Sequence, residues 1–293
     1  MTCSNRCPVP TTNLSGDIPI PSLGFGTFQL KPDDTQGVVE MALEAGYRHI
    51  DTAAAYYNER GVGQALAATG LADKVFVTSK LRNVDQGTES VKRAFDSSIN
   101  QLGLDQIDLY LIHWPVPSLD RYVDTWRTMI DLRETGCVRA VGVCNFMSEH
   151  LERLMRETGK LPCINQVESH PMFWRPQLDE YCSSHGIVVE AYSPLGQGAD
   201  LESPTVREIA GLHNVTPAQV VLRWHVQKGH VAIPKTTHGG RMHENLSIFG
   251  FELTPEQMAR LDAMDSECAR CGNDPYTCDA PQTLEDMRSR GRL

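Results

Sequence analysis

The sequence predicts an α/β fold, a single-domain (β/α)8 TIM barrel spanning residues 1–293. Short apolar strands alternate with amphipathic helices, which is typical of a parallel sheet covered by helices. The alternation occurs eight times, the number that closes such a barrel. An open doubly wound sheet is the alternative. However, Gly24-Phe-Gly26 and Gly61-Val-Gly63 lack the glycine spacing, and the acidic residue that should follow, of a dinucleotide-binding fingerprint.

The eight expected strands are short apolar runs, as strands buried on both faces of a parallel sheet should be. They begin near Ser22, Arg48, Val75, Ile107, Val138, Ile164, Ile187 and Val231. Residues 1–21 form an extension before the first strand. Ser15-Gly16, between polar-apolar runs, predicts a hairpin over residues 12–21 that closes the barrel bottom.

The helices between the strands show one-sided apolar stripes with glycine stops, as surface helices require. One stripe ends at Gly46 and another at Gly103. Three later helices carry start signals, namely Ser203-Pro204, Thr216-Pro-Ala-Gln219 and Thr254-Pro-Glu-Gln257, of which the last is a capping box. The C-terminal tail, residues 265–293, is polar and irregular, and we expect it to lie over the surface.

Composition narrows the class of protein. The formal net charge is −10, which argues against nucleic acid or an anionic membrane as a main partner. The sequence has no apolar run of about 20 residues and no apolar signal core at its start, so neither a membrane span nor secretion is expected. Nine cysteines, an odd number, fit a reducing cytoplasm better than a disulfide framework. We expect a cytoplasmic monomer.

The cysteines near the end raise one alternative. Cys268-Ala-Arg-Cys271, with Cys278 nearby, could bind a metal or form a redox pair. A closed zinc site needs four ligands, and no second pair or matching histidine spacing accompanies these cysteines, so no metal site is predicted. Cys3 and Cys7 lie at an end that we expect to be mobile.

Polar residues stand where successive strands should end, and barrel enzymes do their chemistry at that face. Asp51 ends the second strand, Lys80 the third and His113 the fourth, while Tyr56 follows in the loop after Asp51. A buried ammonium needs a partner, and Asp51 is available. Lys80 should lower the pKa of the Tyr56 phenol from about 10 towards working pH.

Each of these residue types, found alone at a strand end, more often has a structural role, but the four together indicate a catalytic site. A phenol, an ammonium and an imidazole at one mouth suit the protonation of a carbonyl oxygen while a hydride reaches its carbon. The side chains of a protein supply no hydride, so a nicotinamide cofactor is required. The predicted substrate is therefore a small molecule with a carbonyl group.

A second constellation lies near the last barrel strand. Lys235-Thr236 ends that strand, and Arg241, with Glu244-Asn245, reads as the start of the next helix. Two cations and a helix N-terminus suit a phosphate, which a barrel often holds after strands seven and eight. A solvated basic turn is the alternative reading.

At these residues the chain resembles the aldo-keto reductase superfamily, from Leu23-Gly-Phe-Gly-Thr27 to about Leu261. The motifs that carry the resemblance agree in order: Gly46-Tyr-Arg-His-Ile-Asp-Thr-Ala-Ala-Ala-Tyr56, Val77-Thr-Ser-Lys80, Asp108-Leu-Tyr-Leu-Ile-His-Trp-Pro115, Gly142-Val-Cys-Asn-Phe146, Asn165-Gln-Val-Glu168, Tyr192-Ser-Pro-Leu-Gly196 and Ile233-Pro-Lys-Thr236. The short stretch after His113 looks like small microbial members such as 2,5-diketogluconate reductases.

The resemblance implies an eight-stranded barrel and NADPH-dependent, reversible reduction of aldehydes and ketones. It implies that Tyr56 is the general acid, that Lys80 and Asp51 tune it, and that His113 orients the substrate. It assigns the cofactor contacts to Gly26, Thr27, Asp51, Cys144, Asn145, Gln166, Tyr192, Ser193, Leu195, Lys235, Thr236, Arg241, Glu244 and Asn245. It assigns the substrate pocket to Phe28, Tyr56, His113, Trp114 and Phe146.

Within the cofactor set, the resemblance gives specific roles. Asn145 and Gln166 would contact the carboxamide, and Tyr192 would stack on the nicotinamide. Lys235, Thr236 and Arg241 would bind the 2′-phosphate, and Glu244 and Asn245 would bind the adenine.

The chain departs from the family pattern in places. Cys144 replaces a serine, Ser169 a tyrosine, and Gly239-Gly240 a Pro-Glu pair, while the tail from Cys268 matches least. Cys144 raises the hypothesis of oxidation-sensitive activity, although a small packed residue is the simpler reading. The rival function is an NADPH-binding redox sensor of the potassium-channel β-subunit type with little turnover.

Overall fold

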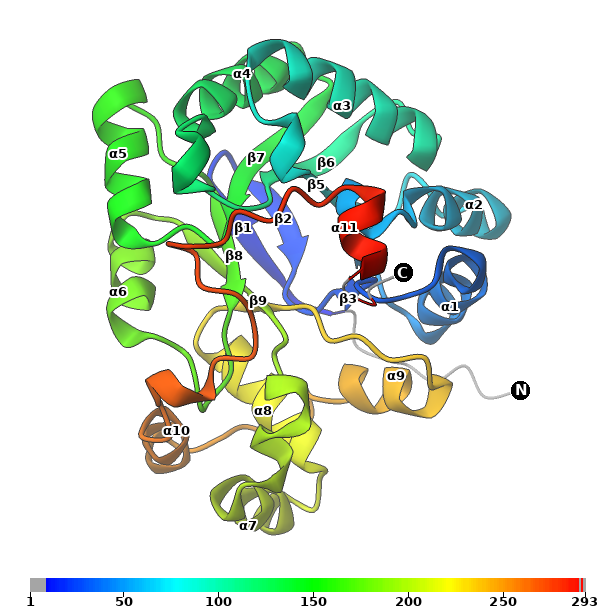
Figure 1. The fold of residues 1–293 in the computed structure, drawn as a ribbon. Helices are drawn as coiled ribbons and strands as arrows, with labels where there is room; N and C mark the ends of the chain where they lie inside the picture. Colours follow the sequence, from blue (N-terminus) through cyan, green and yellow to red (C-terminus); the bar gives the residue numbers. More distant parts are fainter. Residues whose placement is uncertain (1–8, 290, 292–293) are drawn as a thin grey trace.

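Eight parallel strands form the barrel in the computed structural model, which describes residues 9–289 and 291 (Figure 1). In sheet order the strands are β3 (Phe25–Gly26), β4 (His49–Asp51), β5 (Phe76–Leu81), β6 (Ile107–Ile112), β7 (Val138–Cys144), β8 (Ile164–Glu168), β9 (Val188–Tyr192) and β10 (Val231–Ala232). The sheet closes because Leu23 pairs in parallel with Ala232, whose carbonyl oxygen accepts a 2.8 Å hydrogen bond from the Gly24 amide. The predicted barrel is confirmed, and the open sheet is wrong.

Helices cover the outside of the barrel, and most follow a strand directly (Figure 1). They are α1 (Pro32–Ala45), α2 (Glu59–Thr69), α3 (Thr88–Leu102), α4 (Tyr122–Glu134), α5 (Ser148–Thr158), α6 (Pro176–Ser184), α7 (Pro204–His213), α8 (Pro217–Gln227), α9 (Gly239–Leu246), α10 (Pro255–Asp262) and α11 (Leu284–Ser289).

Helix starts follow the local capping chemistry. The Thr216 hydroxyl accepts a hydrogen bond from the Gln219 amide, and Thr254 and Gln257 repeat the arrangement at α10, so both starts are capping boxes. The start of α9 differs from the prediction. It begins at Gly239 rather than at Arg241, because the backbone of both glycines continues the helix upstream.

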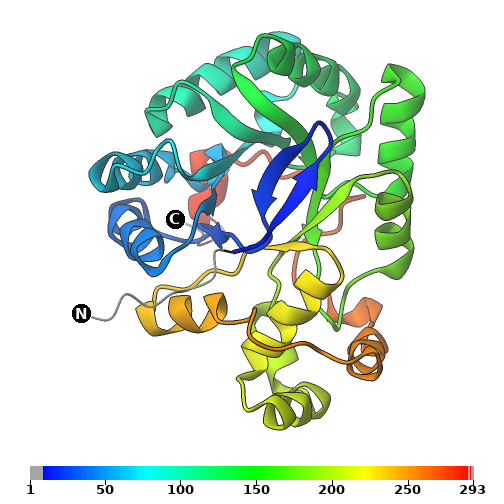
Figure 2. The same ribbon diagram turned by 180° about the vertical axis from the view of Figure 1, so that it is seen from behind.

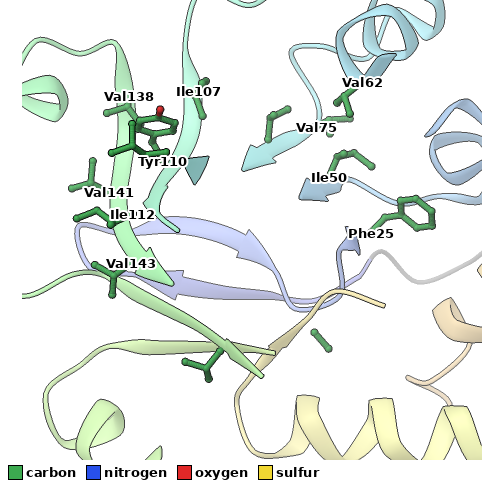
Figure 3. Close-up of a cluster of buried hydrophobic side chains, with 14 of the residues drawn as sticks. Phe25, Ile50, Val62, Val75, Ile107, Tyr110, Ile112, Val138, Val141 and Val143 are labelled. Carbon is green, nitrogen blue, oxygen red and sulfur yellow. The ribbon is translucent and has the colours of Figure 1, made fainter. Parts of the chain in front are cut away.

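The core has two layers. Side chains of β6 and β7 such as Tyr110 and Val141, labelled in Figure 3, belong to the larger buried cluster, and the Tyr110 ring lies 5.2 Å from the Phe95 ring of α3 outside the strands. Inside the barrel, Leu109 and Leu111 meet Leu14 and Ile20 of an N-terminal hairpin. That hairpin pairs β1 (Thr11–Leu14) with β2 (Ile18–Pro21) in antiparallel register and lies across the N-terminal end of the barrel (Figure 2).

The C-terminal tail differs from the expectation of an irregular surface segment. It crosses the opposite end of the barrel and finishes in α11 (Figure 1). Cys278 and Ala280 are buried against Trp114 and Val116, which follow β6. The Asn83 amide group donates a 2.7 Å hydrogen bond to the Ala280 carbonyl oxygen. These apolar contacts and hydrogen bonds make the tail part of the barrel mouth.

Within the described residues, 9–289 and 291, no helix has the length and apolar character that a bilayer crossing requires. Cys3 and Cys7 lie outside that range.

One glycine of the rejected fingerprint has a packing role. A β-carbon on Gly63 of α2 would lie 2.2 Å from the backbone oxygen of Leu102 in α3, so only glycine permits this approach. We expect Gly63→Ala to destabilise the protein by about 1–3 kcal/mol, because the helices must separate. Urea-induced unfolding followed by circular dichroism measures the effect.

Gly37→Ala is the matched control, since Gly37 lies in α1 with no atom within 4 Å of an added β-carbon. That change should stabilise by about 0.5–1 kcal/mol through helix propensity. Equal midpoints for wild type and Gly63→Ala would contradict the packing argument.

Candidate active site

Three neighbouring strands bring the four predicted polar residues together. Asp51 ends β4, Lys80 lies near the end of β5, and His113 directly follows β6. Because β4 pairs with β5 and β5 with β6, all in parallel, these ends share one mouth. Tyr56, expected in a loop, ends the short 3-10 helix η1 (Ala54–Tyr56) above them.

Lys80 is the centre of this group. Its ammonium donates hydrogen bonds to Asp51 Oδ1 at 2.6 Å, to the Thr52 carbonyl oxygen at 2.9 Å and to the Tyr56 hydroxyl at 3.3 Å. The side chain is fully buried. The His113 ring lies edge-on to the Tyr56 ring with 5.7 Å between centroids. The predicted convergence of phenol, ammonium, carboxylate and imidazole is present in the structure.

The electrostatics of Tyr56 differ from the expectation. Burial raises the pKa of the phenol above its ordinary value, and the opposing effect of Lys80 is smaller. The reason is that Asp51 pairs with Lys80 at 2.6 Å and its negative charge acts on the phenol in the opposite sense. Lys80 does favour the phenolate, as predicted, but burial outweighs it, so the predicted net lowering of the Tyr56 pKa towards working pH is wrong. The phenol keeps its proton at neutral pH, which is the state that a general acid requires.

A buried acid that the sequence reading missed lies behind Asp51. The Gln166 amide nitrogen donates to Asp51 Oδ2 and to Glu190 Oε2, both at 2.7 Å. Glu190 is fully buried in β9, and its Oε1 lies 3.6 Å from His49 Nε2. A glutamate inside the apolar run Val188-Val-Glu-Ala-Tyr192 was the available signal.

Glu190 holds a proton in the folded protein. Burial, followed by the negative charge of Asp51, raises the pKa of Glu190 to about 8. Burial lowers the pKa of His49 to about 3, so this imidazole is neutral and offers no positive charge. Asp51 has the Lys80 ammonium as its partner, whereas the group nearest to Glu190 Oε1 is the neutral imidazole of His49, so the negative charge is better placed on Asp51.

A cleft of about 700 Å³ opens above these groups and extends from Tyr56 and His113 to Lys235 and Arg241. Lys235 and Arg241 are both exposed. The predicted cofactor residues along its wall are Gly26, Asp51, Cys144, Asn145, Gln166, Tyr192, Ser193, Leu195, Lys235 and Arg241. The predicted substrate residues there are Phe28, Tyr56, His113 and Trp114.

The amides in this wall have fixed orientations. Asn145 Oδ1 accepts a 2.8 Å hydrogen bond from the Tyr192 hydroxyl, and Asn145 Nδ2 donates to the His113 carbonyl oxygen at 3.0 Å. Asn145 and Ser193 both have left-handed backbones, with φ of 64° and 47°. Non-glycine residues rarely adopt this conformation outside constrained sites. The strand ends therefore present preorganised polar groups to the cleft.

Two predicted site residues near the strand ends lie outside the cleft wall. Thr27 is fully buried and donates its hydroxyl proton to the Asp51 carbonyl oxygen at 2.9 Å. Phe146 is also fully buried, with its ring 5.4 Å from that of Tyr122 and 5.8 Å from that of His150. The structure therefore gives no support to Phe146 as a residue of the substrate pocket.

Three residues at the phosphate end are also turned away from the cleft wall. Thr236 accepts a hydrogen bond from the His238 amide at 3.1 Å. Glu244 accepts a 2.8 Å hydrogen bond from the Thr216 hydroxyl. Asn245 is buried and hydrogen-bonds the Tyr47 phenol.

The sequence reading missed the far side of the cleft, which the tail supplies. From the tail, the additional wall residues are Cys271, Gly272, Asn273, Gln282 and Met287, and from the barrel loops they are Gln29, Ala55, Pro194, Gln197, Gly198, Leu201, Ile233 and Pro234. The tail residues among them follow no strand, so the strand-end argument could not find them.

Cys144 gives little support to the oxidation hypothesis. Its thiol is almost completely buried, and burial raises its pKa. Oxidants react with thiolates, which such a site disfavours. Its sulfur accepts a hydrogen bond from Asn145 Nδ2 at 3.1 Å and packs as a small residue.

The chemistry of the cleft wall suits a dinucleotide. Fixed amides at Asn145 and Gln166 stand at one end, beside the Tyr192 ring, and the cations Lys235 and Arg241 stand at the other. Amides suit a carboxamide, an aromatic ring suits a planar ring, and cations suit phosphate.

Comparison with known proteins agrees with this chemistry. The model of the Aldo/keto reductase family matches residues 22–266. An "Aldo-keto reductase" of Mycobacterium sp. (strain JLS) is 45% identical over 269 residues, 92% of this chain and 97% of that protein. "Methylglyoxal reductase DkgA" of Yersinia pestis is 44% identical over 260 residues, 87% of this chain and 92% of that one. A crystal structure of a Gox0644 mutant in complex with NADPH superposes with a TM-score of 0.89 at 42% identity, covering 92% of this chain and 98% of that chain.

The buried proton on Glu190 predicts a pH dependence of stability. Unfolding exposes this carboxyl, whose pKa returns to about 4.5, so between about pH 4.5 and 8 the folded state binds the extra proton. The contribution of Glu190 to stability is fully present below that window and is lost as pH rises through it. Glu190→Gln, which keeps an acceptor for Gln166, should make urea-induced unfolding less pH-dependent in this window.

Glu190→Leu is the control, since it also removes the titration but leaves one Gln166 amide proton without an acceptor. It should lower stability at every pH by about 1–3 kcal/mol relative to Glu190→Gln. If Glu190→Gln and wild type lost stability equally from pH 5 to pH 8, Glu190 would not hold the proton.

Proposed function

This chain belongs to the aldo-keto reductase family and is an NADPH-dependent oxidoreductase, and we propose that Tyr56 acts as its general acid in the reduction of small aldehydes and ketones to alcohols. The observation that carries the proposal is the contact between the Tyr56 hydroxyl and the Lys80 ammonium at the floor of the cleft. A protonated phenol there can meet a carbonyl oxygen entering from the mouth.

The proton movement follows from the geometry. NADPH, when bound, supplies the hydride to the carbonyl carbon. Tyr56 gives its phenolic proton to the carbonyl oxygen, and the phenolate that forms lies 3.3 Å from the Lys80 ammonium. Lys80 is buried and already held by Asp51, so it stabilises the developing charge without reorientation. His113, edge-on to the Tyr56 ring, positions the same oxygen.

The amide of Gln166 is oriented for the carboxamide of the cofactor. Both hydrogens on its nitrogen go to carboxylic groups, one to Asp51 and one to Glu190. Its oxygen is left as an acceptor, with the Cys144 thiol 3.7 Å away. We assign this oxygen to the carboxamide NH2 group. Asn145 lies beside it, and the Tyr192 ring is assigned to stack on the nicotinamide.

The other end of the cleft is assigned to the phosphates. Lys235 and Arg241 are exposed cations on the cleft wall, and Arg241 lies in the first turn of α9. This combination suits the adenosine 2′-phosphate. The family resemblance also implied Thr236 for the phosphate and Glu244 and Asn245 for the adenine, but these three residues lie outside the cleft wall, so the assignment at this end is carried by Lys235 and Arg241.

At the end of the cleft where the substrate would bind, apolar side chains surround the polar groups of Tyr56 and His113. Phe28 and Trp114 line it on the barrel side, and Met287 lines it on the tail side. The relative named methylglyoxal reductase supports small aldehydes and dicarbonyls as the first candidates.

A panel of aldehydes, ketones and dicarbonyls, run with NADPH and NADH side by side, tests the function. Fast oxidation of NADPH with any member excludes a sensor with little turnover. Failure of every member to oxidise NADPH above the background rate would contradict the reductase function.

Tyr56→Phe tests the role of the phenol. Loss of the phenolic proton should lower kcat by about 10²–10⁴-fold, the usual contribution of a positioned general acid. NADPH binding, followed by fluorescence, should stay near the wild-type value. Tyr57→Phe, which removes the neighbouring phenol outside the cleft wall, should turn over at a rate close to wild type. Wild-type-like turnover in Tyr56→Phe would exclude it as the acid.

Arg241→Ala tests the phosphate assignment. Removal of a charge-assisted contact should cost about 1.5–3 kcal/mol in NADPH binding, which is more than tenfold in Kd. The Kd for NADH, which has no 2′-phosphate, should change little. Equal changes in the Kd values for NADPH and NADH would contradict the assignment of Arg241 to the 2′-phosphate.

A further inference from the structure

A cluster of metal-ligating side chains lies on the rim of the cleft, outside the catalytic group. Glu168 ends β8, and His170 follows two residues later. Both are buried. Cys271, an exposed residue of the tail about one hundred positions further on, lies against them. The carboxylate, imidazole and thiol ligand atoms all lie within 4.8 Å of one another, the single such group of three or more among the described residues.

We propose that Glu168, His170 and Cys271 form a zinc-binding site that ties the C-terminal tail to the barrel. The three side chains supply oxygen, nitrogen and sulfur, which are the ligand atoms that Zn²⁺ takes in proteins. Because Cys271 reaches solvent, a water molecule can complete a tetrahedral set. Sites of three protein ligands and one water are the open type of zinc site.

The distances suit a single small cation. Tetrahedral zinc with ordinary bond lengths places its ligand atoms roughly 3.3–3.6 Å apart. His170 Nε2 lies 3.5 Å from Glu168 Oε1 and 4.0 Å from Cys271 Sγ. A rotation of the Cys271 side chain that moves its sulfur by about half an ångström closes the second gap, and an exposed side chain can make that movement.

The surroundings of the cluster orient its ligands. His170 Nδ1 lies 2.7 Å from Asp200 Oδ2, and Asp200 is fully buried in η5 (Asp200–Glu202). A carboxylate on the far nitrogen of a ligating histidine fixes the ring and leaves the other nitrogen for the metal. Glu168 is held by the Cys271 and Gly272 amides, at 2.5 and 2.8 Å.

The proposed metal site lies on the wall of the cleft, so metal binding there would affect access to the cleft. Cys271 and Gly272 line the cleft, and a β-carbon on Gly272 would meet Glu168 Oε2 at 2.7 Å and the Tyr192 hydroxyl at 3.3 Å. The tail therefore packs tightly on the wall at this point. A metal bridging Cys271 to β8 would hold the tail closed, and exchange of small molecules through the mouth would slow.

Direct metal binding to the full-length reduced protein tests the inference. Co²⁺ and Zn²⁺ are the probes. Co²⁺ should bind with a thiolate charge-transfer band, and Zn²⁺ should displace it with a stoichiometry of one. Cys271→Ser should lose the band and weaken Zn²⁺ binding at least tenfold. Asp200→Asn, which leaves the three ligands in place and keeps an oxygen for the Met172 amide, should weaken it by about 10–100-fold.

Cys268→Ser is the matched control, an exposed cysteine three positions earlier in the same tail. It should bind Co²⁺ and Zn²⁺ as wild type does. Thermal unfolding of each variant without metal verifies that the fold is intact. Zn²⁺ should also slow NADPH oxidation by wild type and by Cys268→Ser more than by Cys271→Ser.

Three results would overturn the proposal. The first is no stoichiometric metal binding by wild type, which would leave the cluster as an anchor for the tail alone. The second is equal loss of binding in Cys268→Ser and Cys271→Ser, and the third is a Co²⁺ spectrum without a thiolate band. None of them depends on turnover, so they are separate from a failure of the reductase function.

Discussion

The buried ion pair between Lys80 and Asp51 is the interaction on which the rest of the active site depends. Burial of each charge costs several kcal/mol, and replacement by apolar residues often stabilises a protein, so such a pair is a poor device for stability. Here it places a fixed, fully buried positive charge 3.3 Å from the Tyr56 hydroxyl. The cost of burying the two charges is offset because neighbouring parallel strands align Lys80 with Asp51 and because the Thr52 carbonyl oxygen accepts a further hydrogen bond from the ammonium.

The same burial explains why the Tyr56 phenol keeps its proton. Two opposite charges side by side leave little net field, so desolvation decides the pKa of Tyr56 and keeps its proton on. The charge of Lys80 matters when the proton leaves, because only then does a second negative charge need a partner. Gln166 connects this group to Glu190 behind it, whose raised pKa favours a neutral carboxyl beside the charged Asp51.

The C-terminal tail completes the cleft that the strand ends begin. It is fixed near both ends, by the Asn83 contact to Ala280 and by the Cys271 and Gly272 amides on Glu168. The tail thus adds an apolar residue, Met287, and the polar segment at Cys271 and Gly272 to the cleft wall, while the four predicted polar residues come from the barrel. The polar residues at the strand ends and the residues of the tail thus line different sides of the same cleft.

The sequence by itself determined the barrel and the convergence of Asp51, Tyr56, Lys80 and His113, because strand periodicity and polar strand ends are local signals and closure puts all strand ends at one mouth. It could not give the direction of the Tyr56 pKa, which depends on burial. Only the tertiary structure decided the place of the tail and the contact of Cys271 with Glu168 and His170, because those residues lie about a hundred positions apart and no periodic pattern encodes their approach.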